Sequence, residues 1–254
     1  MPIPKIIHYC WFGGNPMPAS IQKYVETWKR NCPDYTFFCW TEKNYDVCKN
    51  DYLKEAYQAG KWAFVSDFCR LDVLYTYGGI YLDTDVEMVK PLTPFLNARA
   101  FCGFEVKDTL STAVIGAEKG HDIIGDMLAS YANEHFIVNG IENCTPNVIR
   151  LTNLCRVRGL KLNGRRQALQ DIEVYPQVVF SPNSFSQVYN VLPSATTTVH
   201  HMIGSWCSHT RKSNMAGRLR TWCVGALRNT AGSSNVTKLS CLLHKRRRGR
   251  ALCL

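Results

Sequence analysis

Two hydrophobic periodicities alternate along the chain. Between residues 18 and 31 apolar side chains recur at spacings of three and four, which predicts an amphipathic helix. Residues 62–77 are apolar almost all round, so the helix predicted there should be buried. Short apolar runs bounded by Gly, Pro or Asp predict strands at residues 6–12, 35–40, 80–82, 101–104 and 113–117, with extended segments at 172–180 and 196–200. Further helices are predicted at about 46–59, 121–133 and 146–158, the last with Thr145 as N-cap and Pro146 at its first position.

This alternation of strands and helices predicts an α/β fold with a central, mostly parallel sheet. The chain has 254 residues, of which 46% are hydrophobic and 20% charged, so it belongs to the globular rather than the disordered class. Its twelve cysteines contain no Cys-x-x-Cys pair and several lie in apolar runs. We therefore expect reduced cysteines rather than a disulfide scaffold.

The net charge of +10 is concentrated at the C-terminal end. After Glu173 the sequence has 11 basic residues and no acidic one. The composition changes near residue 206, which predicts a domain at 1–206 and a basic, partly helical segment at 207–254. Basic residues interleaved with Leu and Trp suit an anionic membrane surface. Because the N-terminus lacks a signal-peptide layout, we expect a cytoplasmic protein, peripheral on the inner face of the cell membrane.

Two carboxylates follow a short apolar strand. Asp83 and Asp85 come directly after residues 80–82, at the strand end where α/β sheets bind ligands. On extended backbone, side chains two residues apart share a face. Neighbouring carboxylates repel each other unless a cation lies between them, and their hard oxygens suit Mg²⁺ or Mn²⁺ together with phosphate. The pattern predicts a metal site, although an isolated Asp-x-Asp also occurs on solvated turns.

The preceding helix carries polar residues on one face. Ser66, Asp67 and Arg70 have helical spacing within an otherwise apolar segment. Burying such charges is costly unless they are paired or bound to a ligand. Two interpretations remain open and are compatible: a structural ion pair between Asp67 and Arg70, and a site that holds a ligand's phosphate and hydroxyls.

These motifs together resemble glycosyltransferase family 32, the sugar transferases with a DXD motif, which include bacterial capsular and exopolysaccharide enzymes and share a core with the clostridial glucosylating toxins. The resemblance rests on Ser66-Asp67-x-x-Arg70 followed by Gly78-Gly79-x-Tyr81-x-Asp83-x-Asp85. It extends to Pro4-Lys5-Ile6-Ile7-His8-x-x-Trp11, to Trp28, to Cys32-Pro33-Asp34-Tyr35 and to His200-x-x-x-x-Ser205-Trp206. It covers about residues 2–206.

The resemblance implies a GT-A-like fold and a retaining hexosyl transfer, in polysaccharide biosynthesis, from a nucleotide diphosphate sugar to a saccharide or lipid-linked oligosaccharide. A UDP-sugar is the favoured donor and GDP-mannose the alternative. The resemblance also implies catalytic roles for Asp83, Asp85 and Arg70, and Mn²⁺ or Mg²⁺ at Asp83, Asp85 and His200, with His201 as a substitute if the register is shifted by one. The implied donor-binding residues are Trp11, Ser66, Asp67, Arg70, Tyr81, Asp83, Ser205 and Trp206.

Three other functions are weighed against this one. A haloacid-dehalogenase-type phosphatase also has an Asp-x-Asp after an apolar strand, but normally on its first strand. A glycoside hydrolase needs carboxylates on opposite sides of its substrate. A non-enzymatic nucleic-acid-binding protein would explain the basic segment but not a near-neutral body containing the Asp-x-Asp, so no nucleic acid partner is expected.

Overall fold

A computed structural model of the chain describes residues 2–183 and 189–203. Ser205, Trp206 and the basic segment 207–254 lie outside these described residues, as does the predicted domain boundary. The helices are α1 (Ala19–Asn31), α2 (Asp51–Gln58), α3 (Trp62–Tyr77), α4 (Asp122–Ala129), α5 (Asn147–Val157), α6 (Gln177–Phe180) and a 3-10 turn at Thr93–Phe95. The strands are β1 (Ile6–Cys10), β2 (Thr36–Trp40), β3 (Gly79–Leu82), β4 (Val86–Met88), β5 (Ala100–Val106), β6 (Thr109–Leu110), β7 (Val114–Ala117), β8 (Ile137–Val138), β9 (Ile141–Glu142), β10 (Gln167–Ala168), β11 (Glu173–Tyr175) and β12 (Thr198–His200).

The predicted α/β class with a mostly parallel central sheet is confirmed. The strand order is β10-β11-β5-β7-β3-β1-β2, with β6 added beside β5. Strands β2, β1 and β3 are mutually parallel, and β7 is antiparallel to both β3 and β5. Because β11 is parallel to β5 and antiparallel to β10, five of the seven strands share one direction, and β7 and β10 are reversed. Two short pairs, β4 with β12 and β8 with β9, complete the described strands.

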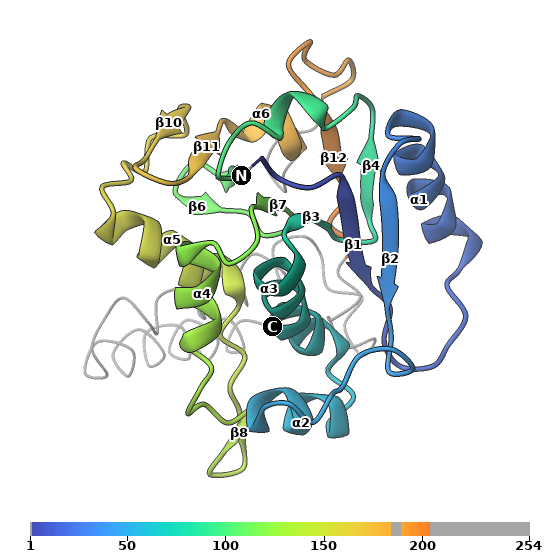
Figure 1. Cartoon of the computed structure of the whole chain (residues 1–254), viewed down its shortest axis with the longest axis vertical. Helices are drawn as coiled ribbons and strands as arrows, with labels where there is room; N and C mark the ends of the chain where they lie inside the picture. Colours follow the sequence, from blue (N-terminus) through green and yellow to red (C-terminus); the bar gives the residue numbers. More distant parts are fainter. Residues whose placement is uncertain (1, 184–188, 204–254) are drawn as a thin grey trace, which may run out of the picture. The chain divides into compact units, whose positions relative to one another are not determined.

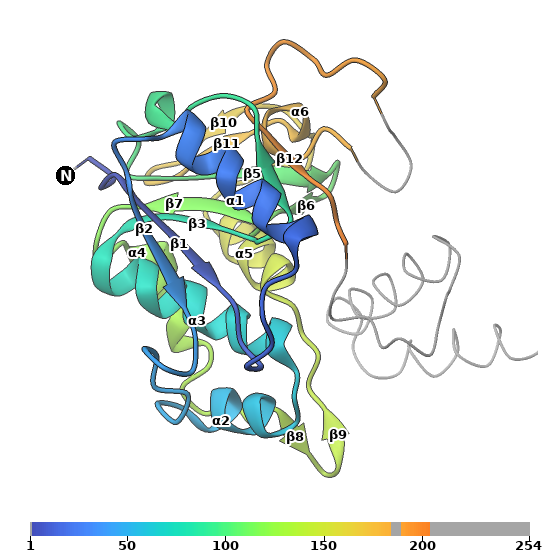
Figure 2. The same cartoon turned by 90° about the vertical axis from the view of Figure 1, so that its right-hand side faces the viewer.

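Helices cover both faces of the sheet (Figure 1 and Figure 2). One hydrophobic cluster unites α3 and α4 with the sheet residues Tyr81 and Cys102, and the other unites α1 with Ile7, Ile80 and Leu82. Alternate residues of β3 thus enter different clusters, as expected for a strand buried on both faces. Helix α3 is buried as predicted and ends at Gly78, whose N–H donates to the Leu74 carbonyl. Among the described residues, no helix combines the length and apolar character needed to cross a bilayer.

Three local predictions were wrong. Helix α2 begins only at Asp51, because the Asn50 side chain accepts a hydrogen bond from the Leu53 N–H and caps it there. Pro146, not Thr145, is the N-cap of α5. The segment 172–180 is not extended throughout, because Pro176 ends β11 and leads into the short helix α6.

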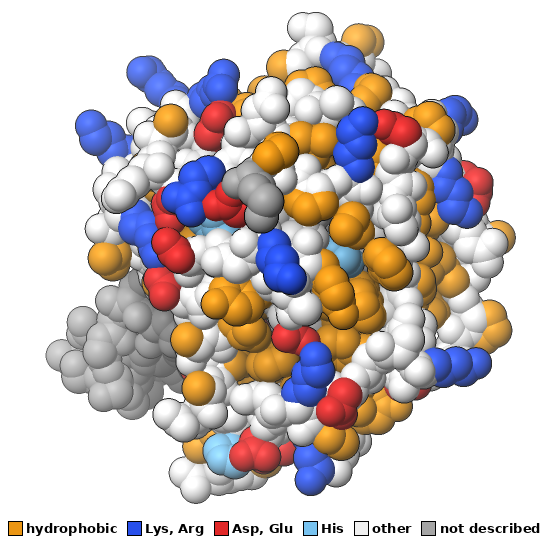
Figure 3. All heavy atoms as spheres, in the orientation of Figure 1, with side chains coloured by type: hydrophobic (Ala, Val, Ile, Leu, Met, Phe, Trp, Pro, Cys, Tyr) orange, Lys and Arg blue, Asp and Glu red, His pale blue; other side chains and the backbone are white. Residues whose placement is uncertain are grey.

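An aromatic stack covers the edge of the sheet near β2. The His8 ring stacks with Phe38, Trp40 and Tyr77 at centroid distances of 5.9–6.1 Å. Figure 3 shows hydrophobic side chains gathered over the region of β1, β2 and α3. The indole of Trp40 donates to His8 Nδ1, so His8 Nε2 carries the proton and donates to the Gly78 carbonyl at 2.9 Å. Burial lowers the pKa of His8, and the neutral ring joins the edge strand to the end of α3.

Gly79 should be intolerant of a side chain. Its φ is +112°, and a Cβ there would lie 2.7 Å from the Ile6 carbonyl oxygen. Gly79→Ala should lower the free energy of unfolding by about 2–4 kcal/mol, from overpacking plus an unfavourable backbone conformation. Gly120 is the matched control, because its φ is +70° but nothing lies within 4 Å of a Cβ. Gly120→Ala should lower the free energy of unfolding by only about 1 kcal/mol. Urea titration of both variants and of the unaltered protein measures these differences. Equal losses in the two variants would contradict the steric argument.

Candidate metal and donor site

The Asp-x-Asp motif lies in a tight turn between β3 and β4. The Asp83 N–H donates to the Ala113 carbonyl of the neighbouring segment, and the Val86 N–H donates back to the Asp83 carbonyl at 3.0 Å. The two carboxylates are therefore brought together by a turn, not by the extended backbone that the sequence pattern suggested. The predicted position at the carboxyl end of β3 is correct.

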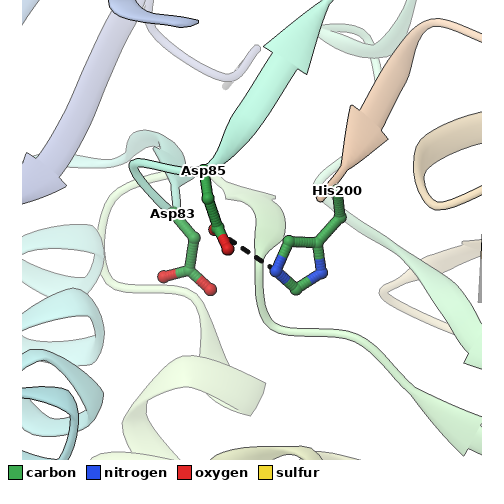
Figure 4. Close-up of side chains that lie close together, drawn as sticks. All are labelled: Asp83, Asp85 and His200. Atoms are coloured by element: carbon green, nitrogen blue, oxygen red, sulfur yellow. Dashed lines mark ion pairs between the residues drawn. The ribbon is translucent and has the colours of Figure 1, made fainter. Parts of the chain in front are cut away.

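Strand β12 brings a histidine to this turn from the far end of the described chain. His200 is paired with Val86 in the antiparallel β4–β12 ladder. Its Nε2 lies 3.3 Å from Asp85 Oδ1, and Figure 4 shows the ring with this nitrogen turned toward Asp85. Backbone groups hold Asp85 in place, because Ile203 N–H donates to Asp85 Oδ2 at 2.8 Å and His201 N–H donates to the Asp85 carbonyl at 3.0 Å.

Asp83, Asp85 and His200 have the geometry of a metal site. One ligand atom from each residue can be chosen so that all lie within 4.8 Å of one another, and all three residues are partly buried. Metal–oxygen distances of about 2.1 Å in an octahedral shell require ligand atoms about 3–4 Å apart, so the three groups fit with small adjustments. The two carboxylates suit Mg²⁺ and Mn²⁺ alike, and the imidazole adds a nitrogen ligand to this set.

His200 and Asp85 shift each other's pKa. Burial alone would lower the pKa of His200, but the hydrogen bond and charge of Asp85, with Glu105 and Asp83, raise it to about 9. Burial also opposes ionisation of Asp85, yet His200 and the Ile203 N–H lower its pKa. Without a cation, the site therefore holds an imidazolium paired with a carboxylate. The ring of His201 instead contacts Glu87 at 2.9 Å and stacks on Tyr24, so it is directed to these residues rather than to the Asp85 carboxylate.

Arg70 connects α3 to the metal site. Its Nη2 lies 3.1 Å from Asp67 Oδ1 and 3.2 Å from Asp83 Oδ1. Its Nη1 donates to the Thr112 carbonyl at 2.7 Å and to the Thr112 hydroxyl at 3.1 Å. The structural ion pair that the helical spacing suggested is therefore present, extended to Asp83. Contact of Arg70 with a donor phosphate stays a prediction.

Asp67 is fixed by the start of α5. The Asn147 backbone N–H donates to Asp67 Oδ2 and its side-chain amide donates to the Asp67 carbonyl at 2.7 Å. Burial raises the pKa of Asp67, and the charge of Arg70 opposes that rise. The pair is 9% and 5% exposed, so it forms the buried floor of the site rather than a solvated ion pair.

The other predicted donor residues lie around this group. The ring of Tyr81 is buried beneath Arg70, whose guanidinium carbon is 4.5 Å from the ring centroid. Ser66 is partly exposed, and its hydroxyl donates to the Trp62 carbonyl. Trp11 is partly exposed after β1, and its indole donates to the Asn15 carbonyl, so it is not a core residue. Their contacts with a donor stay predictions, as do those of Ser205 and Trp206, which lie outside the described residues.

Three residues of this region escaped the sequence analysis. Thr112 and Asn147 are polar residues without a motif around them, and only the fold brings them to Arg70 and Asp67. Glu105 interacts electrostatically with His200, Asp83 and Asp85. A signal for Glu105 existed in the sequence, since it is the one charged residue in the strand Ala-Phe-Cys-Gly-Phe-Glu-Val.

Two solved structures with similarity to this one are titled as glycosyltransferases. The PaToxG glycosyltransferase superposes with a TM-score of 0.49 and 21% sequence identity, covering 63% of this chain and 71% of the other. A glycosyltransferase involved in glycosylation of the major capsid protein of the virus PBCV-1 gives a TM-score of 0.45 and 14% identity, covering 86% of this chain and 98% of the other.

Sequence comparison places the motif in a known family. The model described as "Glycosyltransferase sugar-binding region containing DXD motif" matches residues 18–102. Inositol phosphoceramide mannosyltransferase 3 of Schizosaccharomyces pombe is 34% identical over 130 residues, 48% of this chain and 35% of the relative. The uncharacterized glycosyltransferase L373 of Acanthamoeba polyphaga mimivirus is 32% identical over 135 residues, 48% of this chain and 52% of the relative. The chain thus spans about a third to a half of these relatives' length. The predicted resemblance to the sugar transferases with a DXD motif is confirmed, because residues 18–102 of this chain, which include Asp83 and Asp85, match that family's model.

Proposed function

We propose that the protein is a metal-dependent glycosyltransferase that moves a hexose from a nucleotide diphosphate sugar to a saccharide acceptor. The observation that carries this proposal is the group of Asp83, Asp85 and His200 at the end of β3. Asp83 and Asp85 belong to the segment that matches the DXD family model. A diphosphate is the natural partner of a divalent cation held by hard oxygen ligands at this edge of an α/β sheet.

The donor sugar that we propose to test first is mannose. The fission-yeast relative is named as a mannosyltransferase, and a relative from Saccharomyces cerevisiae is named mannosyl phosphorylinositol ceramide synthase CSH1. The resemblance to family 32 implies a UDP-sugar as the favoured donor, so GDP-mannose and UDP-hexoses are the donor classes to compare. Trp11, partly exposed after β1, is the residue that we propose to stack on the nucleotide base.

The metal ligands and Arg70 have different proposed roles in transfer. Asp83, Asp85 and His200 would hold the cation, which when bound neutralises charge on the leaving diphosphate. Arg70, fixed between Asp67 and Asp83, sets the position of the first carboxylate and adds positive potential beside the diphosphate. We further propose retention of the anomeric configuration and an acceptor that is a saccharide or lipid-linked oligosaccharide of polysaccharide or capsule biosynthesis.

The test of this function is a donor screen. Purified protein with Mn²⁺ and a panel of UDP- and GDP-sugars should release a nucleoside diphosphate from one of them. An NMR time course on the product should show the anomeric configuration of the donor. An inverted product would contradict retention, and no turnover of any donor would contradict the proposed function.

Removing a metal ligand should abolish transfer without unfolding the protein. Asp85→Asn keeps the size of the side chain but weakens the cation site, so activity should fall by at least about 100-fold. Chelation with EDTA should do the same to the unaltered protein. Glu87→Gln is the control, since Glu87 lies two residues away and its carboxylate contacts His201 instead. Full activity of Asp85→Asn, or in EDTA, would contradict a metal-dependent mechanism.

Metal binding should release a proton from His200. A coordinating imidazole must be neutral, whereas the pKa of about 9 keeps His200 protonated at neutral pH. Mn²⁺ affinity should therefore increase with pH, close to tenfold per unit, and level off above about pH 9. Calorimetry in buffers of different ionisation enthalpy should count about one proton released at pH 7.5, and fewer for His200→Asn. An affinity independent of pH between 7 and 9 would exclude His200 as a ligand.

We also propose that the basic segment 207–254 docks the protein on the anionic inner face of the cell membrane. Eleven basic residues and no acid follow Glu173, and each is worth about 1 kcal/mol near such a surface. Full-length protein should sediment with anionic liposomes at low salt and less at high salt. A variant truncated at residue 210 should stay in the supernatant. Equal sedimentation of the two proteins would show that the segment is not the anchor.

A further inference from the structure

Glu105 occupies the same edge of the sheet as the metal ligands. It lies near the end of β5, which runs in the direction of β3, with β7 between the two strands. The carboxyl ends of β5 and β3 therefore lie at one edge of the sheet. Asp83 directly follows the carboxyl end of β3. Glu105 interacts electrostatically with His200, Asp83 and Asp85, which places its carboxylate beside the site.

A bulge in β5 sets the direction of this side chain. In the β5–β6 ladder Phe104 is opposite Leu110, but Val106 is opposite Thr109, so two steps along β5 match a single step along β6. Glu105 is the extra residue. Bulges of this kind bend a strand, re-aim a side chain and are common next to active sites.

The carboxylate of Glu105 has no ion-pair contact within 4 Å among the described residues, although the charge of His200 attracts it. Asp67 and Asp83 contact Arg70, and Asp85 contacts His200, whereas Glu105 forms no ion pair in the part of the chain that the structure describes. Its hydrogen-bond partner is the Ser111 hydroxyl, and burial raises its pKa. A half-buried carboxylate with one hydrogen bond destabilises the fold unless a ligand compensates it.

The position of Glu105 is outside the metal's ligand set. The groups whose atoms all lie within 4.8 Å of one another are Asp83, Asp85 and His200, without Glu105. A carboxylate beside this ligand set but outside it is therefore available to another part of a bound donor.

We propose that Glu105 is a further catalytic residue, whose carboxylate contacts the transferred sugar and stabilises the positive charge that develops at its reacting carbon. The inference rests on the proposed function. During transfer the bond from that carbon to the diphosphate breaks, and its electron pair leaves with the diphosphate. The acceptor oxygen forms the new bond, and its proton passes to a diphosphate oxygen. Glu105 forms no bond, and its negative charge opposes the positive charge at the carbon.

The test compares Glu105→Gln with the unaltered protein, using the donor that the screen identifies. The amide keeps the shape and a hydrogen bond to Ser111 but loses the charge. The kcat should fall by about 100- to 1,000-fold, the cost of removing one charge-stabilising group from a transition state. The affinity for Mn²⁺ with UDP or GDP should change by less than about threefold, because the cation and diphosphate contacts remain. Glu105→Asp should recover part of the activity.

Stability separates catalysis from a structural role. Without ligands, Glu105→Gln should melt at the same temperature as the unaltered protein or above it, since a partly buried carboxylate without an ion-pair contact is replaced by a neutral amide. Glu173→Gln on neighbouring β11 is the control, because its carboxylate has a cation partner in Arg166 and lies away from the metal ligands. Near-normal kcat in Glu105→Gln, a parallel loss of Mn²⁺ or nucleotide binding, or a marked fall in melting temperature would each overturn the inference. Turnover by the unaltered protein decides the proposed function separately.

Discussion

The buried guanidinium of Arg70 is the contact on which the candidate site depends. It lies between Asp67 and Asp83, at 3.1 and 3.2 Å, and is 5% exposed. Two carboxylates so close together would repel each other strongly in a medium of low dielectric, and the cation turns that repulsion into attraction. Removing Arg70 would leave two uncompensated buried carboxylates. The resulting loss of folding stability exceeds the stability that the ion pairs themselves contribute. Helix α3 and the Asp-x-Asp turn are thereby locked in one relative position.

A second carboxylate–cation pair joins the turn to the end of the described chain. His200 and Asp85 are 3.3 Å apart, and the Asp85 carboxylate also accepts the Ile203 N–H. Residues 83–85 are therefore held from two directions, by α3 through Asp83 and by β12 through Asp85. Because His200 is protonated when paired and neutral when coordinating, the same residue can stabilise the site before a cation arrives and bind that cation afterwards. The fold thus preorganises the ligands without leaving two bare carboxylates side by side.

Local chemistry was readable from the sequence, and long-range geometry was not. The apolar strand, the two glycines and the two aspartates predicted a site at the end of β3, and helical spacing predicted the Asp67–Arg70 pair, because both depend on neighbours within a few residues. The approach of Thr112 to Arg70 and of Asn147 to Asp67 depends on how distant elements pack, which no local period encodes. His200 was placed by resemblance to a family. The extra residue in β5 also escaped prediction, since a bulge depends on the register between two strands.

The reversed strand β7 explains how one short segment serves three groups of the site. Since β7 runs against β3 and β5, the chain entering it must pass the carboxyl ends of both strands. Residues 111–113 make this passage: the Ser111 hydroxyl bonds Glu105, the Thr112 carbonyl accepts from Arg70, and the Ala113 carbonyl accepts the Asp83 N–H. A parallel strand in this place would begin at the opposite edge of the sheet, and the segment leading into it would make none of these three contacts. The antiparallel neighbour is therefore part of how the site is built, because it supplies backbone acceptors where carboxylates and a guanidinium must be aligned.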